Sequence, residues 1–209
     1  MAVVITVAQQ KGGTGKTTLA ANLAAALAPT RRVALLDIDP QKSLTRWHAL
    51  RRARLQEAAA LTFSDVSGWR LAAELDRLKQ AHDVVLVDSP PQIDTDARLA
   101  VRGADFVLVP VQPSPPDVWA AEGTLALAAA EGRPAHLVLN RVPPAGKLRG
   151  SVAEDLANRK LPLLRTAIGN RTGFAAAFAE GLGVTEAAPR STAASELRAL
   201  LDELLEMTQ

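Results

Sequence analysis

The stretch that decides the fold is Lys11-Gly12-Gly13-Thr14-Gly15-Lys16-Thr17-Thr18. An apolar run rich in β-branched residues, 3–8, precedes it, and a segment rich in alanine and leucine, 19–27, follows it. The first is typical of a buried parallel strand and the second of a helix. A strand, a glycine-rich turn and a helix in this order predict a phosphate-binding loop.

The chemistry of this loop follows from its residue types. Glycines let backbone N–H groups approach phosphate oxygens, and the start of the next helix adds a partial positive charge. Lys16 can reach the β- and γ-phosphates, and the Thr17 hydroxyl is placed to ligate Mg²⁺. A glycine turn that merely contains a lysine is the alternative, but both flanks fit the loop. We therefore predict an ATP and Mg²⁺ site whose nucleotide-binding residues are Gly12, Gly13, Thr14, Gly15, Lys16, Thr17 and Thr18.

Three aspartates follow predicted strands. Asp37 and Asp39 come at the end of the apolar run 33–37, and Asp88 ends the run 84–88. In parallel sheets such strand ends meet at the nucleotide crevice. An apolar strand ending in aspartate is the Walker B pattern, in which the carboxylate holds the Mg²⁺ shell through water. Another role stays open for Asp37 and Asp39, because aspartate also caps helices well.

The rest of the chain predicts alternating strands and helices. Helical composition or spacing indicates helices from Ser43, as an N-cap, and at 69–81, 94–102, 151–158, after 172 and at 192–207, with an alanine-rich helix ending near 131. Apolar runs indicate further strands at 61–66, 106–111, 135–140 and 161–164. We expect one α/β domain over 1–209, a mostly parallel twisted sheet of about seven or eight strands with helices on both faces, of the P-loop NTPase type.

Composition excludes several classes of protein. The chain has 209 residues, 48% of them hydrophobic, and no cysteine, which rules out disulfides and cysteine-held iron–sulfur clusters within one chain. We find neither a signal-peptide pattern nor an apolar run long enough to span a membrane, and we expect a cytoplasmic protein. The three histidines do not cluster, and we interpret them as structural.

Charge is informative only in its distribution. The net charge is +2, but residues 140–198 hold nine basic and five acidic side chains. Lys and Arg contacts to phosphates supply nonspecific affinity for nucleic acid. Scattered arginines more often form an ordinary solvated face, so this excess alone does not establish a binding surface.

Lys11 directly before the glycines makes the loop similar to the deviant Walker A motif K-G-G-x-G-K-T-T of the ParA/MinD family of dimerising ATPases. Residues 37–41 resemble the family's D-x-D-P-Q motif, and 87–91 resemble its Walker B. The segment 109–115, followed by Asp117, is similar to the short ParF-like partition ATPases. The resemblance runs nearly from end to end and includes 165–168.

This resemblance implies a homodimer that encloses ATP between its subunits. Lys11 would reach the phosphates bound by the other subunit and act with Lys16 as a catalytic cation. Asp39 would orient the attacking water, and Asp37 would join Thr17 and Asp88 near the metal. Asn140 and Arg141 resemble the family's adenine-contacting position, although an asparagine at a strand end often only closes a turn.

The resemblance also implies an output for the ATPase. A weak hydrolysis of ATP to ADP and phosphate, stimulated by a cargo adaptor of ParB type, would release ATP-bound dimers from nonspecific double-stranded DNA. The protein would be nucleoid-associated and would position or segregate a plasmid, a chromosome region or a protein cluster. Candidate DNA contacts are Arg141, Lys147, Arg149, Arg165 and Arg171.

Two other functions on this fold remain alternatives. One is a MinD-like membrane-cycling regulator, but we expect no membrane binding because the polar face of the C-terminal helix is acidic. The other is an ATP-dependent amide-forming synthase, which needs a substrate pocket beyond the nucleotide.

Overall fold

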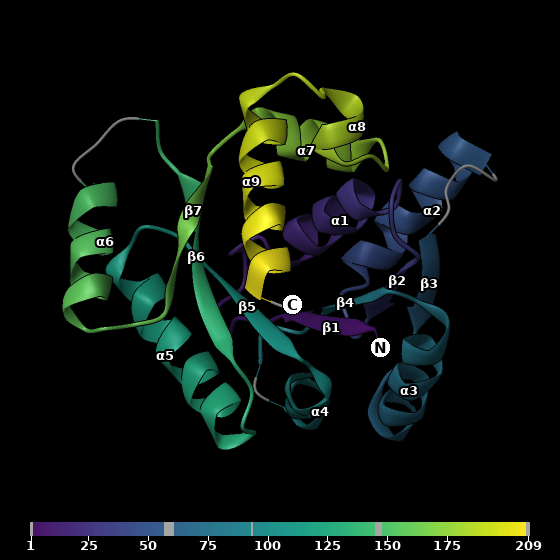
Figure 1. The fold of residues 1–209 in the computed structure, drawn as a ribbon, viewed down its shortest axis with the longest axis horizontal. Coiled ribbons are helices and arrows are strands. Elements are labelled where there is room, and N and C mark those ends of the chain that lie inside the picture. The colour runs from purple at the N-terminus through teal and green to yellow at the C-terminus, as the bar shows by residue number, and fades with distance from the viewer. Residues whose placement is uncertain (1, 57–60, 93, 145–147, 208–209) are drawn as a thin grey trace.

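Seven parallel strands form one sheet in the order β3-β2-β4-β1-β5-β6-β7 (Figure 1). The computed structural model describes residues 2–56, 61–92, 94–144 and 148–207, without the side chains of residues 148, 149, 151 and 153. The predicted α/β fold is therefore confirmed, with seven strands and a wholly parallel sheet. The strands are β1 (Val3–Val7), β2 (Val33–Asp37), β3 (Leu61–Asp65), β4 (Val84–Asp88), β5 (Phe106–Val111), β6 (Ala135–Val142) and β7 (Leu163–Gly169).

Helices cover both faces of the sheet (Figure 1). Each face has its own apolar core, because successive residues of a strand point to opposite sides. One face carries α1 (Lys16–Leu27), α2 (Ser43–Leu55), α7 (Thr172–Ala179), α8 (Val184–Ala187) and α9 (Thr192–Met207). The other carries α3 (Leu71–Ala81), α4 (Thr95–Gly103), α5 (Pro115–Ala130) and α6 (Leu148–Asn158), and the 3-10 turn η2 (Gly68–Arg70) precedes α3.

The register of the central strands sets the position of the site. Asp88 of β4 lies opposite Val7 of β1 and Asp37 of β2. The carboxyl ends of these three strands are therefore level, and the segments that follow them meet at one edge of the sheet. This is the edge at which open parallel sheets bind ligands.

Several predicted boundaries were wrong. Helix α1 begins at Lys16 and not at 19, and β7 extends to Gly169 and not only to 164. Ser43 is the first residue of α2 and not its N-cap, a position held by Lys42 with a left-handed φ of 53°. The short helix α8 was not predicted.

Strand β7 was misjudged because its stabilising contacts are distant in sequence. Glu203 of α9 accepts hydrogen bonds from the backbone N–H groups of Arg165 and Thr166, at 2.7 and 2.9 Å, and Glu196 accepts one from Gly169. The acidic residues of α9 thus cover N–H groups of an edge strand that would otherwise be open. Helix α9 packs its apolar face on the core.

Candidate nucleotide site

The phosphate loop is held in shape by side chains of two neighbouring strand ends. Gln112, after β5, donates from Nε2 to the Gly13 carbonyl at 3.0 Å, and Asn140 of β6 donates from Nδ2 to the Thr14 carbonyl at 2.7 Å. Gly15 has a φ of +95°, and a Cβ there would lie 2.5 Å from the Asn140 amide nitrogen. The loop therefore requires glycine at this position and is fixed without a ligand.

A cavity of about 330 Å³ lies over this loop. Gln41 and Ser43, at the start of α2, form one wall, and Pro91, after β4, contributes to another. The structure brings these predicted residues together around it: Gly12, Gly13, Gly15, Lys16, Thr17, Thr18, Asp39 and Arg141. Backbone N–H groups and cations in one cavity suit a chain of phosphates.

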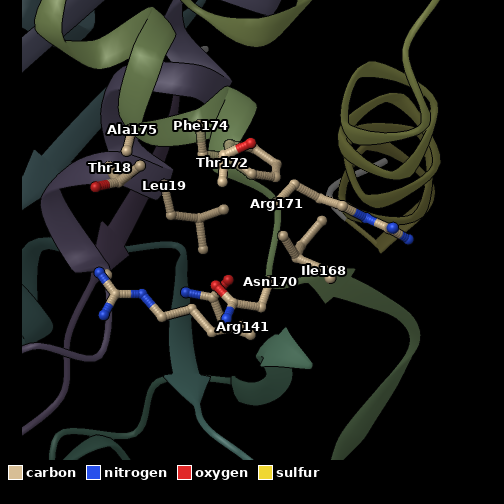
Figure 2. Close-up of a pocket in the computed structure, with 12 residues that line it drawn as sticks. Thr18, Leu19, Arg141, Ile168, Asn170, Arg171, Thr172, Phe174 and Ala175 are labelled. Atoms are coloured by element: carbon tan, nitrogen blue, oxygen red, sulfur yellow. The ribbon is translucent and has the colours of Figure 1, made fainter. Parts of the chain in front are cut away.

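A second cavity of about 310 Å³ adjoins the first (Figure 2). Both are lined by Gly15, Thr18 and Arg141. Leu19 and Phe174 supply apolar surface in the second cavity, which suits a nucleobase. Asn140 also lines it, so its predicted adenine contact stays a prediction beside the hydrogen bond that it makes to the loop.

Some lining residues were missed by sequence reasoning. Asn170 and Phe174 belong to the segment after β7, which carries no recognisable motif. Gln112 and Gln41 lie inside motifs that were recognised, but their roles depend on which backbone groups the fold places beside them.

Lys16 is buried at the base of the phosphate cavity. Burial lowers the pKa of its ammonium, and the carboxylates of Asp88 and Asp39 act in the opposite direction. Its Nζ lies 3.5 Å from the Lys11 carbonyl oxygen, at the limit of a hydrogen bond. Its positive charge therefore lies among hydrogen-bond acceptors and remains available to a phosphate group.

Asp88 provides the test of whether the site fits a metal ion. Its carboxylate is fully buried, and burial raises its pKa to about 8, an effect that the nearby Thr17 hydroxyl partly opposes. Neither oxygen has a hydrogen-bond partner of good geometry among the described residues. Buried carboxylate oxygens without donors, beside a threonine hydroxyl, fit Mg²⁺ with its water shell. The described residues contain no group of three or more His, Cys, Asp or Glu side chains that could hold a metal ion.

Asp37 accepts hydrogen bonds from its own chain, and its predicted place near the metal stays a prediction. Its Oδ2 accepts hydrogen bonds from the backbone N–H and the hydroxyl of Thr45, at 2.9 and 2.7 Å, and its Oδ1 accepts one from the Asp39 N–H. These contacts fix the first turn of α2, which is the capping role that the sequence left open. Asp39 faces the phosphate cavity and accepts from the Gln41 N–H at 2.9 Å.

Lys11 forms an ion pair within its own chain. Its Nζ lies 2.5 Å from Oδ2 of Asp117, in the first turn of α5, and the Ser114 hydroxyl donates to the same oxygen. The Lys11 side chain is 41% exposed, whereas that of Asp117 is 3% exposed. The cation is therefore held at the surface by a buried carboxylate.

Among the described residues, the predicted DNA contacts Arg141, Arg165 and Arg171 are not gathered into one free basic surface. Arg165 pairs with Glu203 and Glu206, and Arg171 points away from the cavity to pair with Glu196 of α9 (Figure 2). Arg141 lines both cavities of the nucleotide site. Lys147 and the side chain of Arg149 lie outside the described residues.

Comparison with known proteins assigns the class of protein that this fold and site define. The profile of the CobQ/CobB/MinD/ParA nucleotide binding domain matches residues 5–184, so the chain belongs to this family. It is 33% identical over 216 residues to maintenance of carboxysome distribution protein A of Halothiobacillus neapolitanus, covering 98% of this chain and 97% of that protein.

Two solved structures share the fold. Apo McdA of Cyanothece superposes with a TM-score of 0.82 at 18% identity, covering 98% of this chain and 100% of that one. Cobyrinic acid a,c-diamide synthase of Mycobacterium smegmatis, solved with an ATP analogue and magnesium, gives 0.78 at 22% identity, covering 98% and 94%. Among the described residues, no helix has the length and apolar character needed to cross a membrane.

Proposed function

We propose that this protein is a ParA-type ATPase that positions or segregates a cargo through ATP-dependent dimers on nonspecific DNA. The observation that carries the proposal is the presence of Lys11 before a complete phosphate loop, in a chain that is similar over nearly its whole length to a carboxysome distribution protein. That relative favours a protein assembly as the cargo over a plasmid or a chromosome region.

Each residue of the site has a role in hydrolysis. The N–H groups of residues 12–18 and the Lys16 ammonium bind the phosphates, and Asp39 orients a water for attack on the γ-phosphorus. Thr17 would hold Mg²⁺ directly and Asp88 through water. When bound there, the ion neutralises charge that develops on the phosphate oxygens.

Lys11 links hydrolysis to assembly. In the structure its ammonium is paired with Asp117 of its own chain. A second subunit that presents ATP gives this exposed cation a stronger anionic partner, and supplying it in trans adds a charge of the kind that stabilises phosphoryl transfer. The dimer then persists only while the γ-phosphate is present, and an adaptor that stimulates hydrolysis makes the dimer dissociate.

The test is the oligomeric state and duplex binding of the wild type and of Lys11→Ala with ATP, with ADP and without nucleotide. We expect ATP alone to give dimers that bind a duplex of arbitrary sequence, with affinity that falls steeply as salt rises. Lys11→Ala should still bind ATP but stay monomeric and leave DNA unbound. Sedimentation velocity and fluorescence anisotropy measure the two properties.

Two results would contradict parts of the proposal. A wild type that hydrolyses ATP but stays monomeric in every nucleotide state would exclude the sandwich dimer. ATP-dependent dimers that bind anionic vesicles and not DNA would replace the partition function with the membrane-cycling alternative.

A further inference from the structure

Helix α2 carries a dense group of positive charges. From Lys42 to Gln56 the sequence has five cations, Lys42, Arg46, Arg51, Arg52 and Arg54, and no carboxylate. Three acidic residues from other elements pair with three of them: Asp65 with Lys42, Glu186 with Arg51 and Glu180 with Arg54.

Arg46 and Arg52 are left without an ion pair among the described residues, and both are exposed. Arg165 and Arg171 differ, because each would have to leave a glutamate of α9 before it could contact a phosphate. The carboxylates of α9 would also repel a polyanion that approached them. Electrostatics therefore favours α2 over Arg165 and Arg171 as a phosphate-binding surface.

The exposed face of α2 has a shape that suits a phosphate backbone. Ala49 and Ala53 are exposed between the arginines, so a backbone can approach the helix closely. Leu50, 47% exposed, is the only large apolar side chain on this face within the described residues. A helix that lies in a lipid surface needs a continuous apolar face, which this one lacks. The other side of α2 is fixed to the core through Leu44 and Trp47.

Helix α2 is also joined directly to the phosphate cavity. Gln41 and Ser43 line that cavity, and Asp39, which also lines it, accepts a hydrogen bond from the Gln41 N–H. Asp37 holds the first turn of the helix through Thr45. A nucleotide that moves Asp39 or Gln41 therefore acts on the start of α2, which provides a physical route from nucleotide state to this basic face. In Figure 1 the helix lies at the outer end of the sheet, beside the edge strand β3.

We propose that the exposed face of α2 is the surface that binds the backbone of double-stranded DNA, with Arg46 and Arg52 as its phosphate contacts. This inference rests on the proposed DNA binding and places it on α2 instead of on Arg165 and Arg171. Contacts of this kind carry no sequence information, which agrees with nonspecific binding.

The experiment compares Arg46→Ala/Arg52→Ala with a control that removes the same charge, Arg31→Ala/Arg70→Ala. Arg31 and Arg70 are exposed, without an ion pair among the described residues, and lie outside α2. Duplex binding of ATP-bound dimers is measured by anisotropy between about 50 and 200 mM salt. We expect the α2 variant to lose about tenfold in affinity, with the slope of log K against log salt reduced by about 0.9 for each lost contact, and the control to stay near wild type.

Two further measurements separate the causes of any loss. Arg46→Lys/Arg52→Lys keeps both charges and should keep most of the binding. ATP turnover and ATP-dependent dimerisation should match wild type in all variants.

Equal binding by the α2 variant and the control would overturn the inference while leaving DNA binding intact. A wild type that dimerises but binds no DNA would overturn the proposed function itself. Binding to phosphatidylglycerol vesicles alone, lost in the α2 variant, would overturn DNA as the occupant.

Discussion

At the scale of single residues, the two side chains of the ion pair between Lys11 and Asp117 are unequally exposed to solvent. The lysine is half exposed and can be solvated by water, whereas the aspartate is buried, and its Oδ1 has no hydrogen-bond partner in the part of the chain that the structure describes. A buried carboxylate that loses its cation costs far more than an exposed cation that loses its carboxylate. The nucleotide-free protein therefore needs Lys11 beside Asp117, and transfer of Lys11 to a second subunit leaves that carboxylate uncompensated.

This inequality predicts the outcome of a double-mutant cycle on the nucleotide-free protein. Lys11→Ala should lower the free energy of unfolding by about 1–3 kcal/mol, because the Asp117 carboxylate loses its charged partner. Asp117→Asn should cost less, and the double variant should be more stable than Lys11→Ala alone. Urea unfolding measures all four proteins. Additive effects of the two substitutions would show that the pair contributes nothing.

At the scale of elements, the start of α2 is fixed by a residue of a strand. The N-cap residue, Lys42, has a left-handed backbone and makes no capping hydrogen bond with its side chain. Asp37, at the end of β2, instead accepts from the backbone N–H and the hydroxyl of Thr45 in the first turn of the helix. The cap therefore also attaches the helix to the sheet. Burial raises the pKa of Asp37, and these hydrogen bonds act in the opposite direction.

We expect Thr45→Val to lower the free energy of unfolding by about 1 kcal/mol, because one hydroxyl donor is lost while the backbone N–H still reaches Asp37. Asp37→Ala removes the acceptor for both donors and should cost more, about 1–3 kcal/mol. With Asp37→Ala already present, Thr45→Val should have little further effect. Chemical denaturation tests this, and an equal effect of Thr45→Val in both backgrounds would refute the shared cap.

At the scale of the whole molecule, surface ion pairs make stability depend on pH. Arg32, just before β2, donates hydrogen bonds to Asp83, just before β4, and holds the pKa of that carboxyl at about 2. Arg77 does the same for Glu74 on α3, whose pKa is also about 2. Both pKa values lie below their ordinary values of 3.8 and 4.5, so the unfolded chain binds protons more readily than the folded one.

The sign of the effect follows from linkage. The stability that these two carboxylates contribute is complete above their unfolded pKa values and is lost as pH falls toward 2. We expect Asp83→Asn/Glu74→Gln to be less stable than wild type at neutral pH, and the difference to narrow between about pH 5 and about pH 3. Urea titrations at several pH values measure it. A difference that stays constant over this range would contradict the depressed pKa values.

The sequence by itself determined the nucleotide loop, the order of strands and helices, and the place of Asp88. These features are local: a glycine-rich turn needs its own residues, and a fully buried parallel strand is apolar along its whole length. The strands that end in Asp37 and Asp88 could therefore be predicted, and parallel order then placed both aspartates at one edge.

Only the tertiary structure decided which partners the charged and polar side chains have. Sequence spacing does not show that Asp117 holds Lys11, or that Glu196 and Glu203 cover the edge of β7 and pair with Arg171 and Arg165. Nor does it show that Arg46 and Arg52 have no ion pair among the described residues. The reason is physical. Propensity and apolar periodicity act within one segment, whereas a hydrogen bond or an ion pair depends on atoms that the folded chain brings within about 3 Å from distant positions.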